Sequence, residues 1–407
     1  MKELRETKKL FLTTPLDEAT ICARCGACNA VCCTHREQDW ESTSPRGWLT
    51  ILRGLADSSG HISDIPPDFV DRVFNCTTCG KCGQVCPVHI DLRRLWLGLR
   101  GEIVERGEGP AFVEQMNGVV AREHNVFDFP NDERAEWVEF MSDAPDHRYQ
   151  KEKAGVLYYV GCVSSFSPAA QGITRALAKV LEESGTDFAI LGGEEWCCGF
   201  PLMAAGLRKD AQAMIEHNLE RLRSLGARTV VFNCPSCYHM WKHEYHLEGV
   251  ELLHHTEFLA RLIREGLLNL GMLEGVVTYH DPCDLGRNSG VYDPPREVLN
   301  SIRGLTLAEM LHNREEALCC GGGGDFEMLA PAMTQKIATR LVQEAVDADA
   351  QRLIVACPQC KRVEISGADA LNAKLQIIDI AELVREAMLS AKRVESKQNQ
   401  GGADGPS

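Results

Sequence analysis

The sequence lacks long apolar runs, an export signal and clusters of positive charge. Its longest plainly apolar stretches, such as GVLYYVGCV at 155–163, have strand length and fall far short of the roughly 20 residues of a membrane span. The start of the chain is charged and has no sustained apolar core, so we expect no signal peptide. The net charge of −15 argues against a surface for nucleic acid or anionic lipid, because both need clustered Lys and Arg. We expect a cytoplasmic protein that reaches a membrane only through a partner subunit.

Nucleotide-binding motifs are also missing. The GGGG run at 321–324 is not followed by Gly-Lys-Ser/Thr and is therefore no phosphate loop. Its expected role is to let the backbone crowd Cys319 and Cys320. Without a flavin or nicotinamide motif, two-electron chemistry on an organic substrate needs a partner. The partners we expect are other subunits of a redox complex: a flavoprotein, a ferredoxin or a membrane cytochrome.

Cysteine, in contrast, is abundant, with 19 residues in a chain of 407. An odd number without an export signal argues against a disulfide scaffold, because reducing cytosol keeps thiols free. Closely spaced cysteines in a cytosolic protein are more often metal ligands or redox groups. The spacing of the cysteines distinguishes the kinds of site.

The first cysteine pattern occurs twice, as CARCGACNAVC from Cys22 and CTTCGKCGQVC from Cys76, at an offset of 54 residues. The spacing C-x2-C-x2-C-x3-C is typical of [4Fe–4S] cubanes, and in two-cluster proteins the fourth cysteine of each run binds the other cluster. Zinc, the alternative, usually uses two well separated C-x2-C pairs. The pattern thus predicts two cubanes, one held by Cys22, Cys25, Cys28 and Cys86, the other by Cys76, Cys79, Cys82 and Cys32.

Cys33 occupies the position after the first run, where most such runs have proline. By symmetry with Cys86, Cys32 takes the place of the fourth ligand, and Cys33 is interpreted as an additional thiol near the cluster. An exchange between Cys32 and Cys33 is the alternative, because adjacent thiols compete for one iron. The 43 residues between Cys32 and Cys76 carry apolar residues at helical spacing. They predict a larger, α-helical ferredoxin domain, similar to that of succinate dehydrogenase-type subunits.

A second, longer repeat fills the rest of the chain. A lone cysteine, a Cys-Cys-Gly and a C-x-x-C recur at offsets of 121, 122 and 123 residues. Each copy alternates strand and helix patterns, which predicts a largely parallel sheet, and each cysteine group follows a strand end, where such sheets bind ligands. We expect two duplicated α/β units in pseudo-twofold arrangement, each with a five-cysteine metal site. These candidate catalytic and metal-binding residues are Cys162, Cys197, Cys198, Cys234 and Cys237 in the first unit and Cys283, Cys319, Cys320, Cys357 and Cys360 in the second.

The expected organisation is α/β with an α-helical N-terminal part. It comprises a two-cubane ferredoxin domain at 1–110, a helical linker at 111–153, the two α/β units at 154–274 and 275–388, and a disordered tail at 389–407. His280 and Asp281 are candidates to donate a proton to a departing thiolate, and equally candidates for supporting polar groups near Cys283. Histidines 239, 243 and 246 are expected to be surface or supporting residues.

The strings YVGCVSS, WCCGFP, NCPSCY, HDPCDLGR, CCGGGGDFE and ACPQC resemble the cysteine-rich CCG-domain family. A ferredoxin domain fused to two such domains is similar to the D-subunit family of heterodisulfide reductases. The resemblance implies one noncubane [4Fe–4S] cluster per CCG domain, with electrons passing from the cubanes to these clusters to reduce a disulfide. The alternative is a non-catalytic electron relay for a flavin-dependent dehydrogenase of the 2-hydroxy acid or glycerol-3-phosphate type. Both motifs keep all five cysteines, which favours the reductase. One departure is Asp284, where relatives often have histidine.

Overall fold

The computed structural model describes residues 15–59 and 61–401, and its N-terminal part is helical. The helix α5 begins after Ser44, whose hydroxyl accepts a hydrogen bond from the Gly47 N–H at 2.9 Å and so caps the helix. Trp48 of α5 and Trp96 of α8 meet edge to face, with ring centroids 5.0 Å apart, in the core of this part. The elements are α2 Pro15–Thr20, α3 Ala27–Val31, α4 Cys33–Gln38, η1 Glu41–Thr43, α5 Pro45–Ser58, η2 Ile62–Asp64, α6 Pro67–Phe74, α7 Lys81–Gln84 and α8 Leu92–Glu105.

The first α/β unit contains a parallel four-stranded sheet in the order β2-β1-β3-β4. Its central strands β1 and β3 are apolar and buried, as expected where helices cover both faces of a sheet. The strands are β1 Val156–Tyr159, β2 Phe188–Ala189, β3 Thr229–Phe232 and β4 Glu251–His254. The helices are α10 Cys162–Phe166, α11 Gln171–Glu183, η4 Gly192–Glu194, α12 Phe200–Ala205, α13 Arg208–Leu225, α14 Pro235–Glu244 and α15 His255–Arg264.

The second α/β unit repeats this topology, with a parallel sheet in the order β6-β5-β7-β8. The predicted fold class, a helical part followed by two duplicated α/β units, is thus confirmed. The strands are β5 Gly275–Tyr279, β6 Leu305–Leu307, β7 Arg352–Val355 and β8 Gln376–Asp379. The helices are α16 Asp293–Ser301, η5 Arg314–Glu316, α17 Phe326–Leu329, α18 Pro331–Asp347, α19 Pro358–Leu371 and α20 Ile380–Gly401.

The two units pack through equivalent elements. Helix α11 of the first unit contacts α20 of the second, and the corresponding pair, α16 and α15, makes the reciprocal contact. At the centre of this interface His255 Nε2 lies 3.1 Å from Asp379 Oδ1, and both side chains are fully buried. Since α16 is equivalent to α11 and α15 to α20, the same contact occurs twice across the interface, and the arrangement has pseudo-twofold symmetry.

The segment expected to be a helical linker contains α9 Ala111–Glu123 and the 3₁₀ helix η3 Asn131–Phe140. It contributes to the core of the first α/β unit, because Arg134 and Trp137 are almost completely buried. Trp137 stacks on Tyr149, with ring centroids 6.5 Å apart. The segment is therefore packed as part of the first α/β unit.

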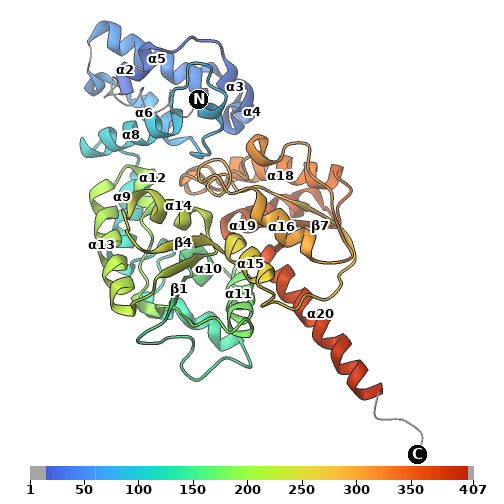
Figure 1. Cartoon of the computed structure of the whole chain (residues 1–407). Helices are drawn as coiled ribbons and strands as arrows, with labels where there is room; N and C mark the ends of the chain where they lie inside the picture. Colours follow the sequence, from blue (N-terminus) through green and yellow to red (C-terminus); the bar gives the residue numbers. More distant parts are fainter. Residues whose placement is uncertain (1–14, 60, 402–407) are drawn as a thin grey trace, which may run out of the picture.

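The expectation of a disordered tail from residue 389 is wrong for residues 389–401, because α20 continues to Gly401. An apolar face with helical spacing, including Leu383, Val384, Ala387 and Ala391, is buried against the rest of the protein and supports this helix. Its last turns extend away from the body (Figure 1). The remaining tail residues lie outside the described part, and the other predicted domain limits stay predictions. Among the described helices, none is long and apolar enough to cross a membrane.

Candidate metal centres

The N-terminal cysteine runs lie on two matching turns. Gly26 and Gly80 precede α3 and α7 with φ of 80° and 78°, a left-handed conformation that glycine adopts without steric cost. Burial and the nearby Cys22 raise the pKa of Cys28 to about 12, and Cys86 and Cys25 act on it in the same direction. Cys86, from the distant second run, is thus near enough to Cys28 to affect its pKa, as expected for a ligand of the first predicted cubane.

The cysteines of the second predicted cubane line a hollow in the N-terminal part. Burial raises the pKa of Cys82 well above its usual value, and Cys76, Cys79 and Cys32 add to the shift, so these four thiols lie together. The hollow is lined by Cys32, Cys33, Cys76, Cys79 and Cys82, among other residues. Four half-buried thiols around a hollow are a donor set that fits an iron–sulfur cluster.

Cys32 and Cys33 have different neighbours. Cys32 Sγ lies 3.2 Å from the Thr34 hydroxyl. Cys33 Sγ is grouped with the sulfurs of Cys79 and Cys319, all within 4.8 Å of one another. Cys33 thus lies where the N-terminal part meets the second α/β unit, a position that the sequence did not indicate.

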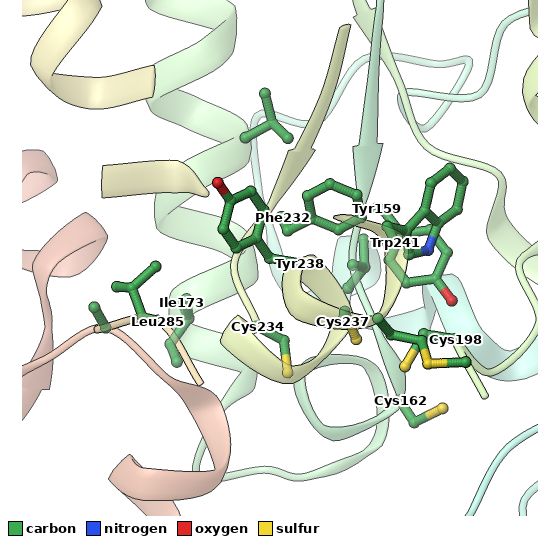
Figure 2. Close-up of a cluster of buried hydrophobic side chains, with 14 of the residues drawn as sticks. Tyr159, Cys162, Ile173, Cys198, Phe232, Cys234, Cys237, Tyr238, Trp241 and Leu285 are labelled. Carbon is green, nitrogen blue, oxygen red and sulfur yellow. The ribbon is translucent and has the colours of Figure 1, made fainter. Parts of the chain in front are cut away.

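In the first α/β unit, four of the five predicted cysteines, Cys162, Cys198, Cys234 and Cys237, lie beyond the ends of β1 and β3 (Figure 2), and Cys197 directly precedes Cys198. The thiols shift one another's pKa between neighbours in the order Cys162, Cys197, Cys198, Cys237 and Cys234. Hydrogen bonds from Cys197 and Cys237 lower the pKa of Cys198 to about 6. Cys234 precedes α14, where the positive end of the helix dipole favours a thiolate.

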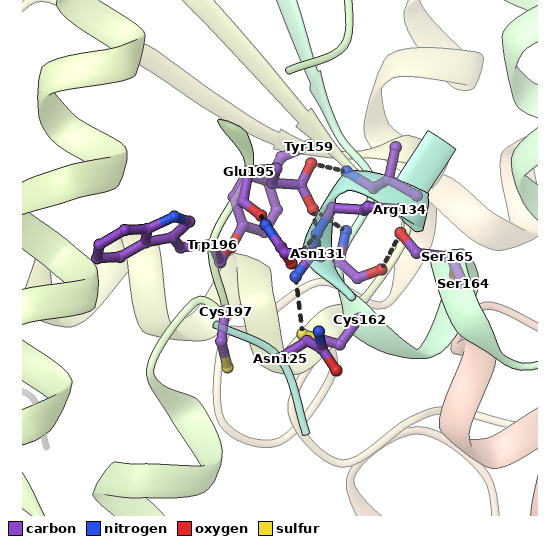
Figure 3. Close-up of polar contacts among 12 residues, drawn as sticks. Asn125, Asn131, Arg134, Tyr159, Cys162, Ser164, Ser165, Glu195, Trp196 and Cys197 are labelled. Carbon is purple, nitrogen blue, oxygen red and sulfur yellow. Dashed lines mark hydrogen bonds and ion pairs between the residues drawn. The ribbon is translucent and has the colours of Figure 1, made fainter. Parts of the chain in front are cut away.

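A buried ion pair supports this group from the side of η3. Arg134 donates to Glu195 Oε1 at 3.0 Å and to Cys162 Sγ at 3.6 Å (Figure 3). The Glu195 carboxylate accepts the backbone N–H groups of Val160 and Gly161, each at 2.8 Å. Burial alone would lower the pKa of Arg134, but Cys162 and Glu195 raise it, so the guanidinium stays charged. Sequence reasoning missed both residues, because Arg134 lies in the supposed linker, 28 residues before Cys162.

The second unit gathers its five cysteines in the same order. Cys360 Sγ lies 3.2 Å from Cys320 Sγ, and the Cys357 thiol accepts the Cys360 N–H at 3.4 Å at the start of α19. Hydrogen bonds from Cys283 and Cys320, and then from Cys33 and Cys79, lower the pKa of Cys319 well below its usual value. The cysteine group of the second unit therefore lies next to Cys33 and Cys79 of the N-terminal part.

The GGGG run, which was expected to let the backbone crowd Cys319 and Cys320, also lets the second unit approach the second cysteine run closely. A Cβ on Gly323 would lie 2.9 Å from the Thr77 carbonyl oxygen, and one on Gly324 would lie 2.8 Å from that of Cys76. The close neighbours of these glycines therefore belong to the second cysteine run. The seam is reinforced by Arg287, which donates to the carbonyls of Cys79 and Ala317 at 3.0 and 2.6 Å.

Asp284, the departure from the family pattern, joins all three parts of the chain. Its carboxylate accepts hydrogen bonds from Arg93 of α8, Ser236 of α14 and Asn288 at 3.3, 2.7 and 2.8 Å. Burial would raise the pKa of Asp284, but Arg93 and His239 outweigh this effect and lower it. Because Ser236 lies between Cys234 and Cys237, Asp284 fixes the two cysteine groups relative to each other.

The candidate proton donors separate into two environments. Asp281 accepts two hydrogen bonds of 2.8 Å from Arg296 and one from the Arg314 N–H, so its carboxylate holds neighbouring segments together. His280 lies among Cys320, Cys360 and Glu364. Burial lowers the pKa of His280 to about 4, which keeps the ring neutral. His239 of α14 contacts Arg93 and Ser289, whereas His243 of the same helix and His246 beyond its end are exposed.

Two family models match the chain. The cysteine-rich domain matches residues 156–242 and 277–363, and the 4Fe-4S dicluster domain matches residues 18–90. These matches imply two cubanes in the N-terminal part and agree with further metal sites at the CCG cysteines.

Similar proteins span nearly the whole chain. The D-subunit of the dihydromethanophenazine:CoB--CoM heterodisulfide reductase of Methanosarcina acetivorans is 34% identical, covering 94% of this chain and 97% of that protein. Its counterpart in Methanosarcina mazei is 35% identical over the same shares. The EtfAB:quinone oxidoreductase of Syntrophomonas wolfei is 29% identical over 78% of this chain, which spans 47% of that protein. A solved structure of a hypothetical protein from Helicobacter pylori has a TM-score of 0.58 at 10% identity, over 95% of this chain and 75% of that one, and shows the fold alone.

Proposed function

Because the chain is an iron–sulfur oxidoreductase subunit of the D-subunit family of heterodisulfide reductases, we propose that it reduces an organic disulfide at its two CCG cysteine groups. Electrons enter at the N-terminal cysteine runs and reach the α/β units across the seam at Cys79 and Cys319. The reaction consumes one disulfide, two electrons and two protons and releases two thiols.

The observation that supports this proposal best is the complete five-cysteine group in each unit, with the two groups linked through Ser236 and Asp284. Two-electron reduction of a disulfide separates two sulfur atoms, and paired sites give each sulfur a place of its own. The clusters that such thiol sets bind would supply electrons one at a time.

The residues of this chain position these groups and exclude water. Arg134 and Glu195 hold the turn that carries Cys162, and Arg287 holds the loop of Cys79 against the second unit. All ten CCG cysteines except Cys283 are buried, and Cys283 is half-buried. A buried, thiol-rich site favours soft metals and keeps reactive thiolates from bulk oxidants.

The first test is the content of iron, acid-labile sulfide and zinc per chain, on protein purified without oxygen. About sixteen irons without zinc would support four [4Fe–4S] clusters, two of them the proposed noncubane clusters. About eight irons with zinc would contradict a catalytic role for the CCG groups. Disulfide reduction is then assayed with a chemically reduced viologen as donor. Cys320→Ala should abolish turnover, and the cubane signals in electron paramagnetic resonance should persist as the internal control.

An electron relay is the second candidate, favoured by the likeness to EtfAB:quinone oxidoreductase. In that case the clusters carry electrons between a flavin dehydrogenase and a quinone. The relay predicts that the protein passes electrons to a quinone analogue and turns over no disulfide. Under either function we propose a cytoplasmic subunit of a larger redox complex, and co-purification with a flavoprotein or cytochrome subunit tests that.

A further inference from the structure

The two CCG cysteine groups differ in the residues that lie beside them. The residue three positions before the first cysteine is Tyr159 in the first unit and His280 in the second. The residue four positions after the last cysteine is Trp241 in the first unit and Glu364 in the second. An aromatic pair in one unit therefore corresponds to an imidazole and a carboxylate in the other.

In the first unit these positions form an apolar contact. The rings of Tyr159 and Trp241 meet at 63° with centroids 5.2 Å apart, above Cys198 and Cys237 (Figure 2). The Tyr159 hydroxyl turns away and donates to the Trp196 carbonyl at 2.6 Å. The pair offers no free donor atom to a metal at these cysteines.

In the second unit the corresponding side chains form a compact set of four donors. One ring nitrogen of His280, the sulfurs of Cys320 and Cys360 and a carboxylate oxygen of Glu364 all lie within 4.8 Å of one another. His280 Nε2 is 3.5 Å from Glu364 Oε1, and the two sulfurs are 3.2 Å apart. A tetrahedral metal with bonds of about 2.0–2.3 Å has ligand atoms about 3.3–3.8 Å apart. The separation of His280 and Glu364 falls within this range, and the two sulfurs lie slightly closer together than it, so small side-chain movements would let all four atoms share one metal.

Burial makes this set unusual. The His280 and Glu364 side chains are 1% and 0% exposed. Both nitrogens of His280 and both oxygens of Glu364 lack a hydrogen-bond partner among the described residues. A buried polar group without a partner costs about 1–3 kcal/mol, and an unpaired carboxylate costs more. A cation between these atoms and the two sulfurs would compensate all four groups at once.

The local structure aims these groups at one point. His280 directly follows β5, and Glu364 lies one helical turn after Cys360 on the same face of α19. Cys320 follows a loop on the other side of the set. The donors therefore come from three separate segments, as in metal sites that form only in the folded protein.

We propose that His280 and Glu364 are metal ligands in the second unit, where they complete a mixed sulfur, nitrogen and oxygen coordination with Cys320 and Cys360. The metal is an iron of the cluster in this unit or a zinc ion. The inference rests on the proposed metal centre of the second unit and adds that this centre differs chemically from the all-sulfur centre of the first.

The test uses the full chain, purified without oxygen, with its histidines labelled with ¹⁵N. Electron–nuclear double resonance of the CCG-cluster signal should show a ¹⁵N coupling of the size of a direct bond. His280→Gln should remove this coupling, Glu364→Gln should retain it, and the exposed His243→Gln serves as the matched control. Iron content and far-ultraviolet circular dichroism show whether each variant has folded and kept its clusters.

Each outcome decides the inference separately from the proposed function. A CCG-cluster signal without a ¹⁵N coupling in the unsubstituted protein overturns the ligand assignment and leaves the disulfide reductase intact. If only about eight irons are present together with zinc, the proposed function fails, and zinc X-ray absorption becomes the readout. Two sulfurs with one imidazole and one carboxylate in a zinc shell then support the assignment, whereas sulfur alone overturns it.

Discussion

Replacing Arg134 by methionine tests whether the ion pair beside Cys162 holds the first cysteine group. The side chains of Arg134 and Glu195 are 2% and 1% exposed, and their atoms are 3.0 Å apart. Removing one partner of a buried pair leaves an uncompensated charge, which typically costs about 3–5 kcal/mol. At roughly 2–4 °C per kcal/mol, we expect the unfolding temperature of the metal-loaded protein to fall by roughly 6–20 °C.

The assay follows thermal unfolding without oxygen by circular dichroism, for Arg134→Met, Glu195→Gln and the double variant. The double variant should lose less than the sum of the single losses, because it leaves neither charge unpaired. Arg148→Met is the matched control, since Arg148 pairs with Glu139 at 3.0 Å but both side chains are 54% exposed. An exposed pair contributes about 0–1 kcal/mol, so this control should unfold close to the unsubstituted protein.

Two results would refute this reasoning. One is an Arg134→Met variant that unfolds as the Arg148→Met control does. The other is strict additivity in the double variant, which would show that the two side chains act independently. Iron content of the same samples shows whether loss of the hydrogen bond from Arg134 to Cys162 also releases metal.

Three further predictions concern the junctions between the parts of the chain. Asp284→Ala should loosen the contact of the three parts, because Arg93, Ser236 and Asn288 lose their shared acceptor. Limited proteolysis should cut this variant faster than the exposed-site variant Asp146→Ala. Equal cleavage rates would contradict the role of Asp284 in joining the three parts. Burial raises the pKa of Asp325 to about 7, above the value of about 3.9 for an unfolded chain, so the folded state binds the proton more tightly and stability falls as pH rises from about 4 to 7. Asp325→Asn should remove up to about 4 kcal/mol of this pH-dependent loss, and an unchanged pH profile of the unfolding temperature would argue against it. Chelation of the metals should expose the N-terminal part to protease before the α/β units, because α3 and α7 have only five and four residues and depend on their cysteine ligands; simultaneous cleavage would be inconsistent with this.

The repeated cysteine spacing, together with the alternating strand and helix patterns of each copy, predicts the two α/β units and places their candidate ligands after strand ends. The prediction works because the carboxyl ends of parallel strands meet at one edge of a sheet, so cysteines after β1 and β3 must approach each other. The same argument applies to β5 and β7. Three thiols of each N-terminal set are close for a local reason, since the turns at Gly26 and Gly80 wrap each run tightly, whereas the fourth comes from the other run.

Contacts between distant segments could not be predicted in this way. Arg134 belongs to a polar segment without a motif, and only the packing of η3 brings it to Cys162. Glu364 reads as an ordinary helical residue until α19 is placed beside β5. The polar composition of residues 389–407 predicts disorder, but α20 begins at Ile380, where Leu383, Val384 and Ala387 anchor it in the core, and the helix continues into this segment.

The duplicated units differ chiefly in the residues beside the cysteine group of the second unit. The cysteines and the left-handed glycines Gly199 and Gly321 occur in both units, so they meet a need that the units share. The residues that differ lie at the second group, where His280 and Glu364 replace an aromatic pair. The second group also receives the N-terminal sulfurs, with Cys33 and Cys79 within 4.8 Å of Cys319. Since cluster ligands and surroundings set the reduction potential, these changes would affect the centre that lies next to the N-terminal cysteines, where we propose that electrons enter. The pseudo-twofold pair is therefore symmetric in its scaffold and asymmetric in its chemistry, as expected if electrons enter through one unit.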